Sequence, residues 1–164
     1  MRLYTWIGVA LVFAGIACGT LRTQTLDKVP DSFPVTKTDA EWKKQLSPDS
    51  YQVLRHAGTE QAFSSSLAES TKKGTYYCAG CGQELFSSDT KFDSGTGWPS
   101  FYKPADRKAV IQRKDTSDGM VRVEVLCSKC GGHLGHVFDD GPAPTGLRYC
   151  MNGVALKFKP APSK

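Results

Sequence analysis

Two short cysteine motifs constrain this chain of 164 residues more than any other feature. Cys78-Ala-Gly-Cys81 and Cys127-Ser-Lys-Cys130 are both C-x-x-C turns followed by glycine, and a long insert separates them. Such a turn lets two thiolates grip one ion, and four thiolates complete the tetrahedral shell of a structural zinc site. The alternatives are two disulfides in an exported protein and a redox-active C-x-x-C pair. A closed four-thiolate shell leaves no position for substrate, so we expect one structural Zn²⁺.

The insert between the cysteine pairs is too long for a free-standing zinc ribbon, so it must carry structure of its own. The chain is long enough for one domain with a core, and 40% of its residues are hydrophobic. Its formal net charge is +5, but the Lys and Arg residues are scattered singly or in pairs. This pattern indicates a solvated basic surface rather than a nucleic-acid interface.

The N-terminus has the layout of an export signal. A charge-free and mostly apolar run extends from Leu3 to Ala17, which is short for a membrane span, although the uncharged interval continues to Leu21. Small residues before Cys18 resemble a bacterial lipoprotein cleavage box. We therefore expect residues 1–17 to be an export signal or an uncleaved membrane anchor. The protein would be exported to the bacterial cell envelope, either periplasmic or lipid-anchored through Cys18.

The residues that follow predict a linker and then two short helices. Residues 18–37 are polar, contain two prolines and show no sustained period, which predicts a linker outside the fold. Thr38 to Glu41 form a capping box that predicts a helix start. Ser47-Pro48 predicts a second helix, with serine as the N-cap and proline in the first turn. The residues expected to face inward are Trp42, Leu46, Tyr51 and Leu54, and both helices should end by about residue 56 or 57.

Beyond a loop at residues 58–74, the chain has the composition of β-strands. In residues 120–126 the valines Val121, Val123 and Val125 alternate with Arg122 and Glu124, so the two sets should lie on opposite faces of a strand. Strands are expected at residues 75–77, 84–86, 108–113, 121–126 and 154–158.

Cys150 lies in the run Arg148-Tyr-Cys-Met-Asn152, after a Gly- and Pro-rich loop. Because the other thiols have assignments, Cys150 is the available nucleophile. A thiol attacks as the thiolate, and a nearby guanidinium lowers the thiol pKa, so Arg148 is the candidate activator. On a strand, Arg148, Cys150 and Asn152 would point to the same face. The alternative is that Cys150 is a small buried hydrophobic residue.

Two histidines, His133 and His136, directly follow the second cysteine pair. They could be further metal ligands, but the four cysteines already complete a tetrahedral shell. Imidazoles titrate near neutrality and suit proton transfer, so we expect both to be catalytic or to bind substrate. The remaining histidine, His56, lies at a predicted helix end and is expected to be a cap or a surface residue.

A second unusual stretch runs from Asp93 to Phe101. Gly95 and Gly97 permit sharp turns, and Pro99 stiffens the chain after Trp98. A loop of this kind can present an indole to a ligand. Packing of Trp98 in the core is the alternative.

Together, T-K-F-D-S-G-T-G-W-P-S-F, the two C-x-x-C pairs, G-G-H-L-G-H-V-F-D-D-G-P and G-L-R-Y-C-M-N resemble the B-type methionine sulfoxide reductases. Those enzymes act on the R epimer of methionine sulfoxide. The resemblance covers residues 38–160 and includes the motif H-x-G-T-E. It implies a mainly β fold, a zinc-stabilised antiparallel two-sheet domain with short N-terminal helices. Residues 161–164 are expected to be a frayed tail.

The resemblance also implies a role for each site residue. Cys150 matches the nucleophile that attacks the sulfoxide sulfur and becomes a sulfenic acid, while a histidine delivers a proton to the oxygen. Trp98 matches the aromatic residue that receives the substrate's methyl group, and Phe138 completes that apolar wall. Arg148 matches the residue that lowers the thiol pKa. The polar groups that hold the sulfoxide oxygen and water match His133, His136 and Asn152.

Two positions depart from the pattern of that family. Thr96 stands where many members have the cysteine that resolves the sulfenic acid as a disulfide. We therefore expect reduction by an external partner, either a small thiol or a thioredoxin-like protein. Gly153 stands where members often have serine, a change expected to reshape the loop without removing a catalytic group.

The partners implied are oxidised proteins that carry methionine-R-sulfoxide, together with the reductant. We expect a monomer that binds no nucleic acid and meets a membrane only through its N-terminal segment. One competing hypothesis is a non-catalytic zinc-knuckle interaction module, which leaves Trp98, both histidines and Cys150 unexplained. The other is a thiol–disulfide oxidoreductase, which needs a redox-active C-x-x-C pair.

Overall fold

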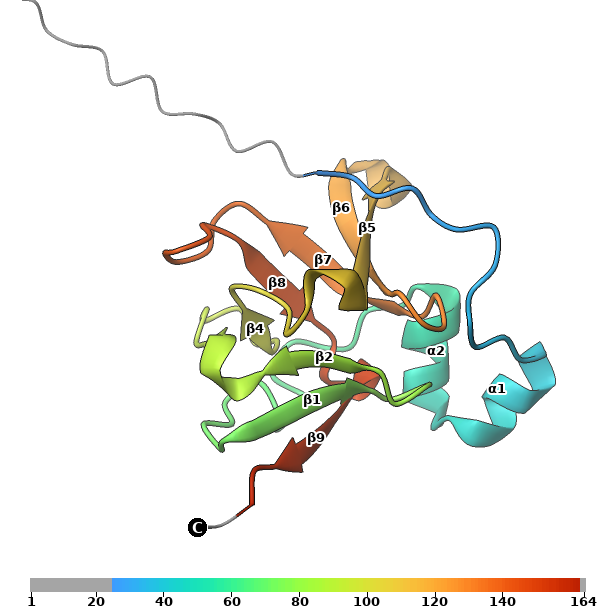
Figure 1. The fold of residues 1–164 in the computed structure, drawn as a ribbon, viewed down its shortest axis with the longest axis horizontal. Helices are drawn as coiled ribbons and strands as arrows, with labels where there is room; N and C mark the ends of the chain where they lie inside the picture. Colours follow the sequence, from blue (N-terminus) through green and yellow to red (C-terminus); the bar gives the residue numbers. More distant parts are fainter. Residues whose placement is uncertain (1–24, 163–164) are drawn as a thin grey trace, which may run out of the picture.

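The computed structural model describes residues 25–162, and the expected leader with Cys18 lies outside this range. Two antiparallel sheets and two short N-terminal helices make up the fold (Figure 1), so the predicted fold class is confirmed. No helix within residues 25–162 is both long enough and apolar enough to span a membrane. Of the expected tail, Ala161 donates its N–H to the carbonyl of Lys73, and residues 163 and 164 are not described.

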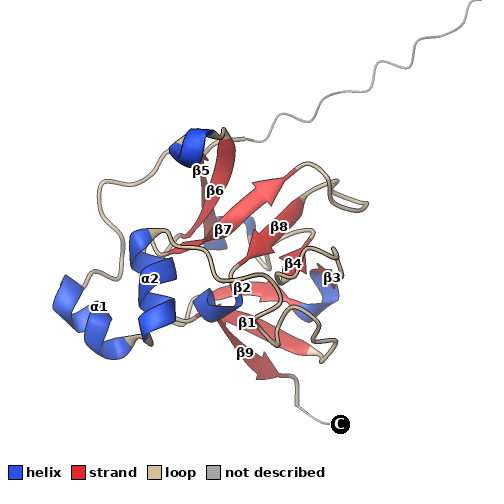
Figure 2. Ribbon diagram, turned by 180° about the vertical axis from the view of Figure 1, so that it is seen from behind, coloured by secondary structure: helices blue, strands red, loops and turns tan. Residues whose placement is uncertain are grey.

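Both sheets are built from neighbouring strands that run antiparallel. The smaller has the order β2-β1-β9 and the larger the order β3-β4-β8-β7-β6-β5 (Figure 2). The strands are β1 (Gly74–Cys78), β2 (Glu84–Ser87), β3 (Lys91–Phe92), β4 (Ser100–Phe101), β5 (Val110–Asp115), β6 (Arg122–Cys127), β7 (His133–Phe138), β8 (Arg148–Met151) and β9 (Leu156–Pro160). Short 3₁₀ turns are η1 (Ser88–Thr90), η2 (Arg107–Ala109), η3 (Ser117–Gly119) and η4 (Gly153–Ala155).

Both predicted helices are present, as α1 (Asp39–Gln45) and α2 (Pro48–His56). The capping box that starts α1 is complete, because the Thr38 side chain accepts from the Glu41 N–H and the Glu41 carboxylate accepts from the Thr38 N–H. Ser47 caps α2 with its hydroxyl, which accepts from the Ser50 N–H. Of the residues expected to face inward, Trp42, Tyr51 and Leu54 are buried, and Leu46 is partly buried against the core.

The core lies between the two sheets, and aromatic rings from both sheets meet in it. Tyr76 and Phe86 come from the smaller sheet, and Phe101 and Tyr149 come from the larger. The Phe86 and Phe101 rings stack with centroids 4.4 Å apart, and Tyr76 meets Phe101 edge-on at 4.9 Å. These contacts hold the sheets face to face and so fix β8, which carries Cys150.

The described part of the expected linker, residues 25–37, lies against the domain. Asp27 donates its N–H to the Gln112 carbonyl, and its side-chain carboxylate accepts from the Gln112 N–H, so it occupies the edge of strand β5 at this residue. Arg107 also holds the Asp27 carboxylate, and Val35 donates its N–H to the Lys129 carbonyl. This segment therefore covers a sheet edge that would otherwise be open.

The strand predictions are least complete around the site. The predicted strands at 75–77, 84–86, 108–113, 121–126 and 154–158 correspond to β1, β2, β5, β6 and β9, with shifted ends, whereas β3, β4, β7 and β8 were not predicted as strands. In β6 the polar face is not a solvent face, because Glu124 is only 4% exposed. Val121 lies before the strand and is 76% exposed.

Candidate active site and metal-binding cluster

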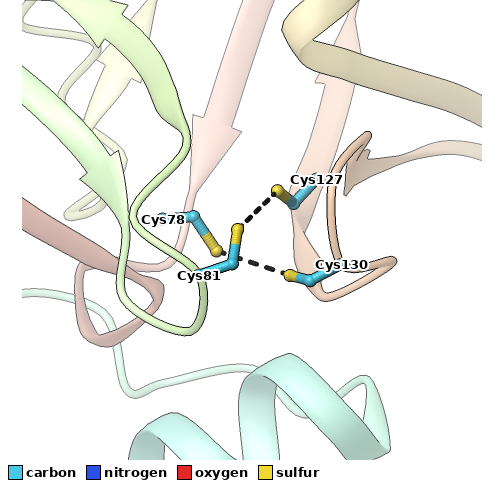
Figure 3. A group of neighbouring side chains, drawn as sticks. All are labelled: Cys78, Cys81, Cys127 and Cys130. Carbon is cyan, nitrogen blue, oxygen red and sulfur yellow. Dashed lines mark hydrogen bonds between the residues drawn. The ribbon is translucent and has the colours of Figure 1, made fainter. Parts of the chain in front are cut away.

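The two cysteine pairs meet, and their four sulfur atoms lie within 4.8 Å of one another (Figure 3). Across the pairs, the sulfur atoms of Cys78 and Cys130 are 3.7 Å apart, and those of Cys81 and Cys127 are 3.5 Å apart. A disulfide would require about 2.05 Å. Four Zn–S bonds of about 2.3 Å in a tetrahedron place the sulfur atoms about 3.8 Å apart. The cluster therefore has the geometry to hold a metal ion.

Each cysteine pair sits in the same kind of turn. The N–H of Gly82 donates to the Cys78 carbonyl at 2.9 Å, and the N–H of Gly131 donates to the Cys127 carbonyl at the same distance. Both glycines have a positive φ, 73° and 67°, which explains why glycine follows each C-x-x-C motif. The first turn joins β1 to β2 and the second joins β6 to β7, so a bound ion links one hairpin of each sheet.

Cys150 belongs to a row of side chains on one face of the larger sheet. It lies opposite Ser100 of β4 and His136 of β7, and His136 lies opposite Glu124 of β6. Residues directly opposite one another on neighbouring strands project to the same face. The sheet register alone thus brings the predicted nucleophile beside one of the predicted histidines.

A pocket of about 150 Å³ opens at this row. It is lined by most of the predicted site residues, while His133 and Arg148 lie just outside the lining. A larger cavity of about 550 Å³ lies elsewhere, beside Arg107 and Tyr149, and its described lining has no cysteine or histidine. The smaller pocket is therefore the candidate site. The predicted residues that line it are Trp98, His136, Phe138, Cys150 and Asn152.

A β-bulge brings His133 to the same face as His136. Residues three apart on a regular strand point to opposite faces, but here Val125 pairs with Gly135 and Leu126 with His133, which leaves Leu134 as an extra residue. Gly135 has φ 152°, and a Cβ there would overlap the Cys150 carbonyl oxygen. The two imidazole centroids end 5.3 Å apart. The bulge is thus the structural reason for the H-L-G-H spacing.

Each histidine is held by a carboxylate that the sequence analysis did not identify. His133 Nδ1 lies 2.7 Å from Glu124, which Arg113 also binds. Burial acts to raise the pKa of Glu124, but hydrogen bonds from His133 and Arg113 bring it below its ordinary value. His133 Nε2 is buried and has no hydrogen-bond partner in the described chain, so its hydrogen-bonding capacity is unused there.

Asp115 plays the same part for His136, with its carboxylate 2.8 Å from His136 Nε2. Arg122, which lines the pocket, pairs with the same carboxylate at 2.9 Å. Hydrogen bonds from Ser117 are the main cause that lowers the pKa of Asp115. Burial lowers the pKa of His136, and the bond to Asp115 opposes that change. Asp115 therefore orients the imidazole and supports its protonated form.

The Cys150 thiol is half-buried, and burial raises its pKa. The Thr96 hydroxyl, 3.9 Å from the sulfur, opposes this rise, and so does the charge of Arg148. Arg148 itself is held by two hydrogen bonds of 2.8 Å to Asp140. Its guanidinium lies 4.4 Å from the centre of the Phe138 ring, which lines the pocket. The activating effect expected of Arg148 is thus present but smaller than the effect of burial.

Trp98 and Asn152, which line the pocket, are held by the loop of residues 58–74, to which the sequence analysis gave no role. The Trp98 indole N–H donates to the Glu60 carbonyl at 3.1 Å. The Asn152 side-chain oxygen accepts from the Glu60 N–H, and its amide nitrogen donates to the Leu134 carbonyl. Glu60 and its neighbour Thr59, which lines the pocket, belong to the motif H-x-G-T-E. That motif was the only sequence signal for this loop.

Residue 153 has little room for a side chain, because Ser65 from the loop of residues 58–74 lies against it. A Cβ at Gly153 would overlap the Ser65 side chain, so the hydroxyl of Ser65 occupies the space beside this turn. The departure from serine at residue 153 is thus matched by Ser65. That the change reshapes the loop without removing a catalytic group stays a prediction.

Comparison with known proteins agrees with this geometry. A SelR domain matches residues 46–160. The peptide methionine sulfoxide reductase MsrB of Leptospira interrogans is 59% identical over 128 residues, 78% of this chain and 98% of that protein. The MsrB proteins of Methanosarcina barkeri and Thiobacillus denitrificans are 62% and 58% identical, covering 76% of this chain and 88% and 94% of theirs. Because the SelR match contains both sheets, both cysteine pairs and the whole pocket, the chain belongs to the SelR-domain family, with the MsrB peptide methionine sulfoxide reductases as its relatives.

Proposed function

We propose that this protein is a peptide-methionine (R)-S-oxide reductase, which returns the R epimer of methionine sulfoxide in proteins to methionine. The observation that carries the proposal is the pocket in which Cys150 lies beside His136, with Trp98 and Phe138 in its lining. Membership of the SelR-domain family and the high identity to MsrB proteins support it.

Cys150 supplies the electrons for the reduction. Its thiolate attacks the sulfoxide sulfur, and a proton from a histidine goes to the oxygen. The oxygen then passes to the Cys150 sulfur as a hydroxyl group, which leaves methionine and a sulfenic acid. In sum, a sulfoxide and a thiol give a thioether and a sulfenic acid. His136 is the best placed proton donor, because it lines the pocket opposite Cys150 and Asp115 orients its ring.

The pocket offers different chemistry to the two substituents of the sulfoxide sulfur. Trp98 and Phe138 form an apolar side for the methyl group, whereas His136 and Asn152 offer hydrogen bonds to the oxygen. His133 Nε2 adds a further polar group behind them. The peptide chain and the attacking Cys150 sulfur fix two of the directions around the sulfoxide sulfur. In the S epimer the methyl group and the oxygen are exchanged, so the methyl group would meet the polar side and the oxygen the apolar side. This is the basis we propose for selection of the R epimer.

The ion of the cysteine cluster is Zn²⁺, in a structural role. Four thiolates suit zinc, and they fill its tetrahedral shell, so no position remains for substrate. When bound, the ion supplies a cross-link between the β1–β2 hairpin and the β6–β7 hairpin. The four cysteines are held in position for the ion by their turns, whose conformation depends on Gly82 and Gly131.

An external thiol regenerates the enzyme. Thr96 holds the place of a resolving cysteine, and the other cysteines of the described chain belong to the metal cluster. One external thiol forms a mixed disulfide with Cys150 and releases water, and a second releases the Cys150 thiol. A dithiol such as a thioredoxin-like protein can supply both.

We propose that the N-terminal segment directs the enzyme to the bacterial cell envelope. Support comes from the apolar run of residues 3–17 and the small residues before Cys18. Mass spectrometry of the mature N-terminus tests this, and a lipid-modified Cys18 or a chain cleaved near residue 17 is expected. Recovery of the intact chain, beginning at Met1, from the cytoplasmic fraction would contradict the proposal.

The activity is tested by turnover of both epimers of a peptide methionine sulfoxide with dithiothreitol. We expect the R epimer to be reduced, the S epimer to be spared, and the Cys150→Ser variant to be inactive. Cys18→Ser is the matched control, since it removes another single thiol and should leave turnover unchanged. Activity retained in Cys150→Ser would overturn the assignment of the nucleophile. A wild-type protein without activity on either epimer would favour the non-catalytic interaction module.

A further inference from the structure

Glu60 contacts both sides of the pocket from the loop between α2 and β1. Its carbonyl accepts the indole N–H of Trp98 at 3.1 Å, and its N–H donates to the Asn152 side-chain oxygen at 2.9 Å. Trp98 belongs to the apolar side of the pocket and Asn152 to the polar side. One residue therefore connects the two sides that must fit the methyl group and the oxygen.

The Glu60 carboxylate fixes the turn that follows Asn152. Its two oxygens accept the N–H groups of Gly153 at 2.6 Å and Val154 at 2.9 Å. Asn152 is the N-cap residue of η4, yet its side chain makes no capping hydrogen bond. Asparagine ordinarily caps a helix start with that side chain. Here the carboxylate of Glu60 satisfies these donors instead.

Because Glu60 takes over the capping role, the Asn152 oxygen can accept the Glu60 N–H instead of capping η4, and the amide can turn toward β7. Its nitrogen donates to the Leu134 carbonyl at 3.1 Å. Leu134 is the extra residue of the bulge that brings His133 and His136 to one face. The carboxylate thus acts, through η4 and Asn152, on the strand that presents the two histidines.

Glutamine cannot replace this carboxylate, although it has nearly the same shape. Each carboxylate oxygen accepts one backbone N–H, and hydrogen bonds to a charged acceptor are stronger than neutral ones. The glutamine side chain has one acceptor oxygen and a donor NH₂. Its NH₂ would face either the Gly153 or the Val154 N–H, so one donor–donor conflict would displace the turn.

We propose that Glu60 is a positioning residue that sets the distance between the Trp98 side and the Asn152 side of the pocket, and thereby limits the alkyl group to methyl. The inference rests on the proposed function, because it concerns how closely that pocket fits its substrate. It assigns no chemical step to Glu60, which acts through Trp98, Asn152 and the bulge.

The test compares the full-length wild type with Glu60→Gln on R-sulfoxide peptides of methionine and of ethionine, which carries one more methylene. We expect kcat/KM for the methionine peptide to fall about 10- to 100-fold, mainly through KM, because small misplacements of a site are costly. The ethionine-to-methionine ratio of kcat/KM should rise about fivefold, since one methylene in a fitted pocket is discriminated about 10- to 200-fold. Alkylation of Cys150 by iodoacetamide should stay within about twofold of wild type, because Glu60 does not touch the sulfur.

Glu41→Gln is the matched control. Glu41 also uses its carboxylate to accept a backbone N–H at a helix start, but it lies in α1 and outside the pocket. It should lose thermal stability without a change in the ethionine-to-methionine ratio. The inference is overturned if Glu60→Gln keeps wild-type kinetic constants, if both variants shift the ratio alike, or if Cys150 alkylation slows in parallel with turnover. A wild type that reduces neither peptide would instead overturn the proposed function.

Discussion

At the scale of single residues, Thr96 stands where the resemblance to the B-type methionine sulfoxide reductases leads one to expect a resolving cysteine. Its hydroxyl lies 3.9 Å from the Cys150 sulfur. The same hydroxyl is hydrogen-bonded to the Ser94 hydroxyl, which is hydrogen-bonded in turn to the Ser100 hydroxyl. The hydroxyls at 96 and 100 and the charge of Arg148 all oppose the rise in thiol pKa that burial causes. Residue 96 therefore offers Cys150 a hydroxyl group for hydrogen bonding and not a second thiol.

Replacing Thr96 by valine should make the thiol less reactive at neutral pH. Valine keeps the shape but removes the hydroxyl that lowers the pKa of Cys150, so that pKa should rise further. Since the thiolate forms as pH rises through the pKa, the pH profile of iodoacetamide alkylation should move to higher pH. Thr96→Ser, which keeps a hydroxyl, is the control. A Val variant with an unshifted profile would show that the hydroxyl does not act on the thiol.

Replacing Thr96 by cysteine should install an internal resolving thiol. The contact between the Thr96 oxygen and the Cys150 sulfur puts residue 96 beside the nucleophile. One turnover with R-sulfoxide and no reductant should then consume both thiols and yield a disulfide, which peptide mapping would identify as 96–150. In wild type the same turnover should leave a sulfenic acid that dimedone traps. Persistent trapping in the cysteine variant would exclude disulfide formation at this site.

Some of these residues could be predicted from sequence and others could not, for physical reasons. The metal cluster follows from spacing, because both cysteines of a pair lie within one turn. The helix caps are equally local, since Thr38 and Glu41 are three residues apart. Glu60, by contrast, bonds to a backbone group 93 residues later, and no local pattern records that contact. Glu124 and Asp115 were missed because only the sheet register puts them behind the histidines.

At the scale of elements, two irregular elements shape the pocket: the bulge in β7 puts both histidines on one face, and the turn η4 follows Asn152. A regular strand would send His133 and His136 to opposite faces, and the sequence pattern alone does not reveal the bulge. The turn η4 then fits closely against the loop of residues 58–74, where Ser65 fills the space beside Gly153. The strand predictions missed β7 and assigned the last two residues of η4 to a strand.

The contact between Ser65 and Gly153 predicts a compensating pair of substitutions. Gly153→Ala should destabilise the protein by about 1–3 kcal/mol, because its methyl group would overlap the Ser65 side chain. Ser65→Gly should relieve most of this overlap, so the double variant should be more stable than additivity predicts. Urea unfolding of the four proteins of this cycle measures the coupling. An additive result would mean that the turn moves away from Ser65 instead.

At the scale of the whole molecule, the cysteine cluster joins the two sheets at the end of the core. Cys78 ends β1 in the smaller sheet, and Cys127 ends β6 in the larger. The second cysteine turn leads directly into β7, because the Cys127 N–H donates to the Gly132 carbonyl just before His133. The metal-binding cluster is thus mechanically connected to the histidine side of the pocket, although it lies outside the pocket lining.

Removal of the metal should therefore reduce stability first and activity as a consequence. Structural zinc sites contribute about 10–16 kcal/mol of apparent binding free energy, so loss of the ion should abolish or greatly weaken cooperative unfolding. The purified protein should contain a single zinc per chain, and a chelator should lower both its melting temperature and its turnover. Cys127→Ser should behave like the chelated protein, whereas Cys150→Ser should keep its zinc and melting temperature but lose activity. A metal-free protein with the melting temperature and turnover of the wild type would contradict a structural role. An increase in reducible disulfides after turnover would instead favour redox-active C-x-x-C pairs.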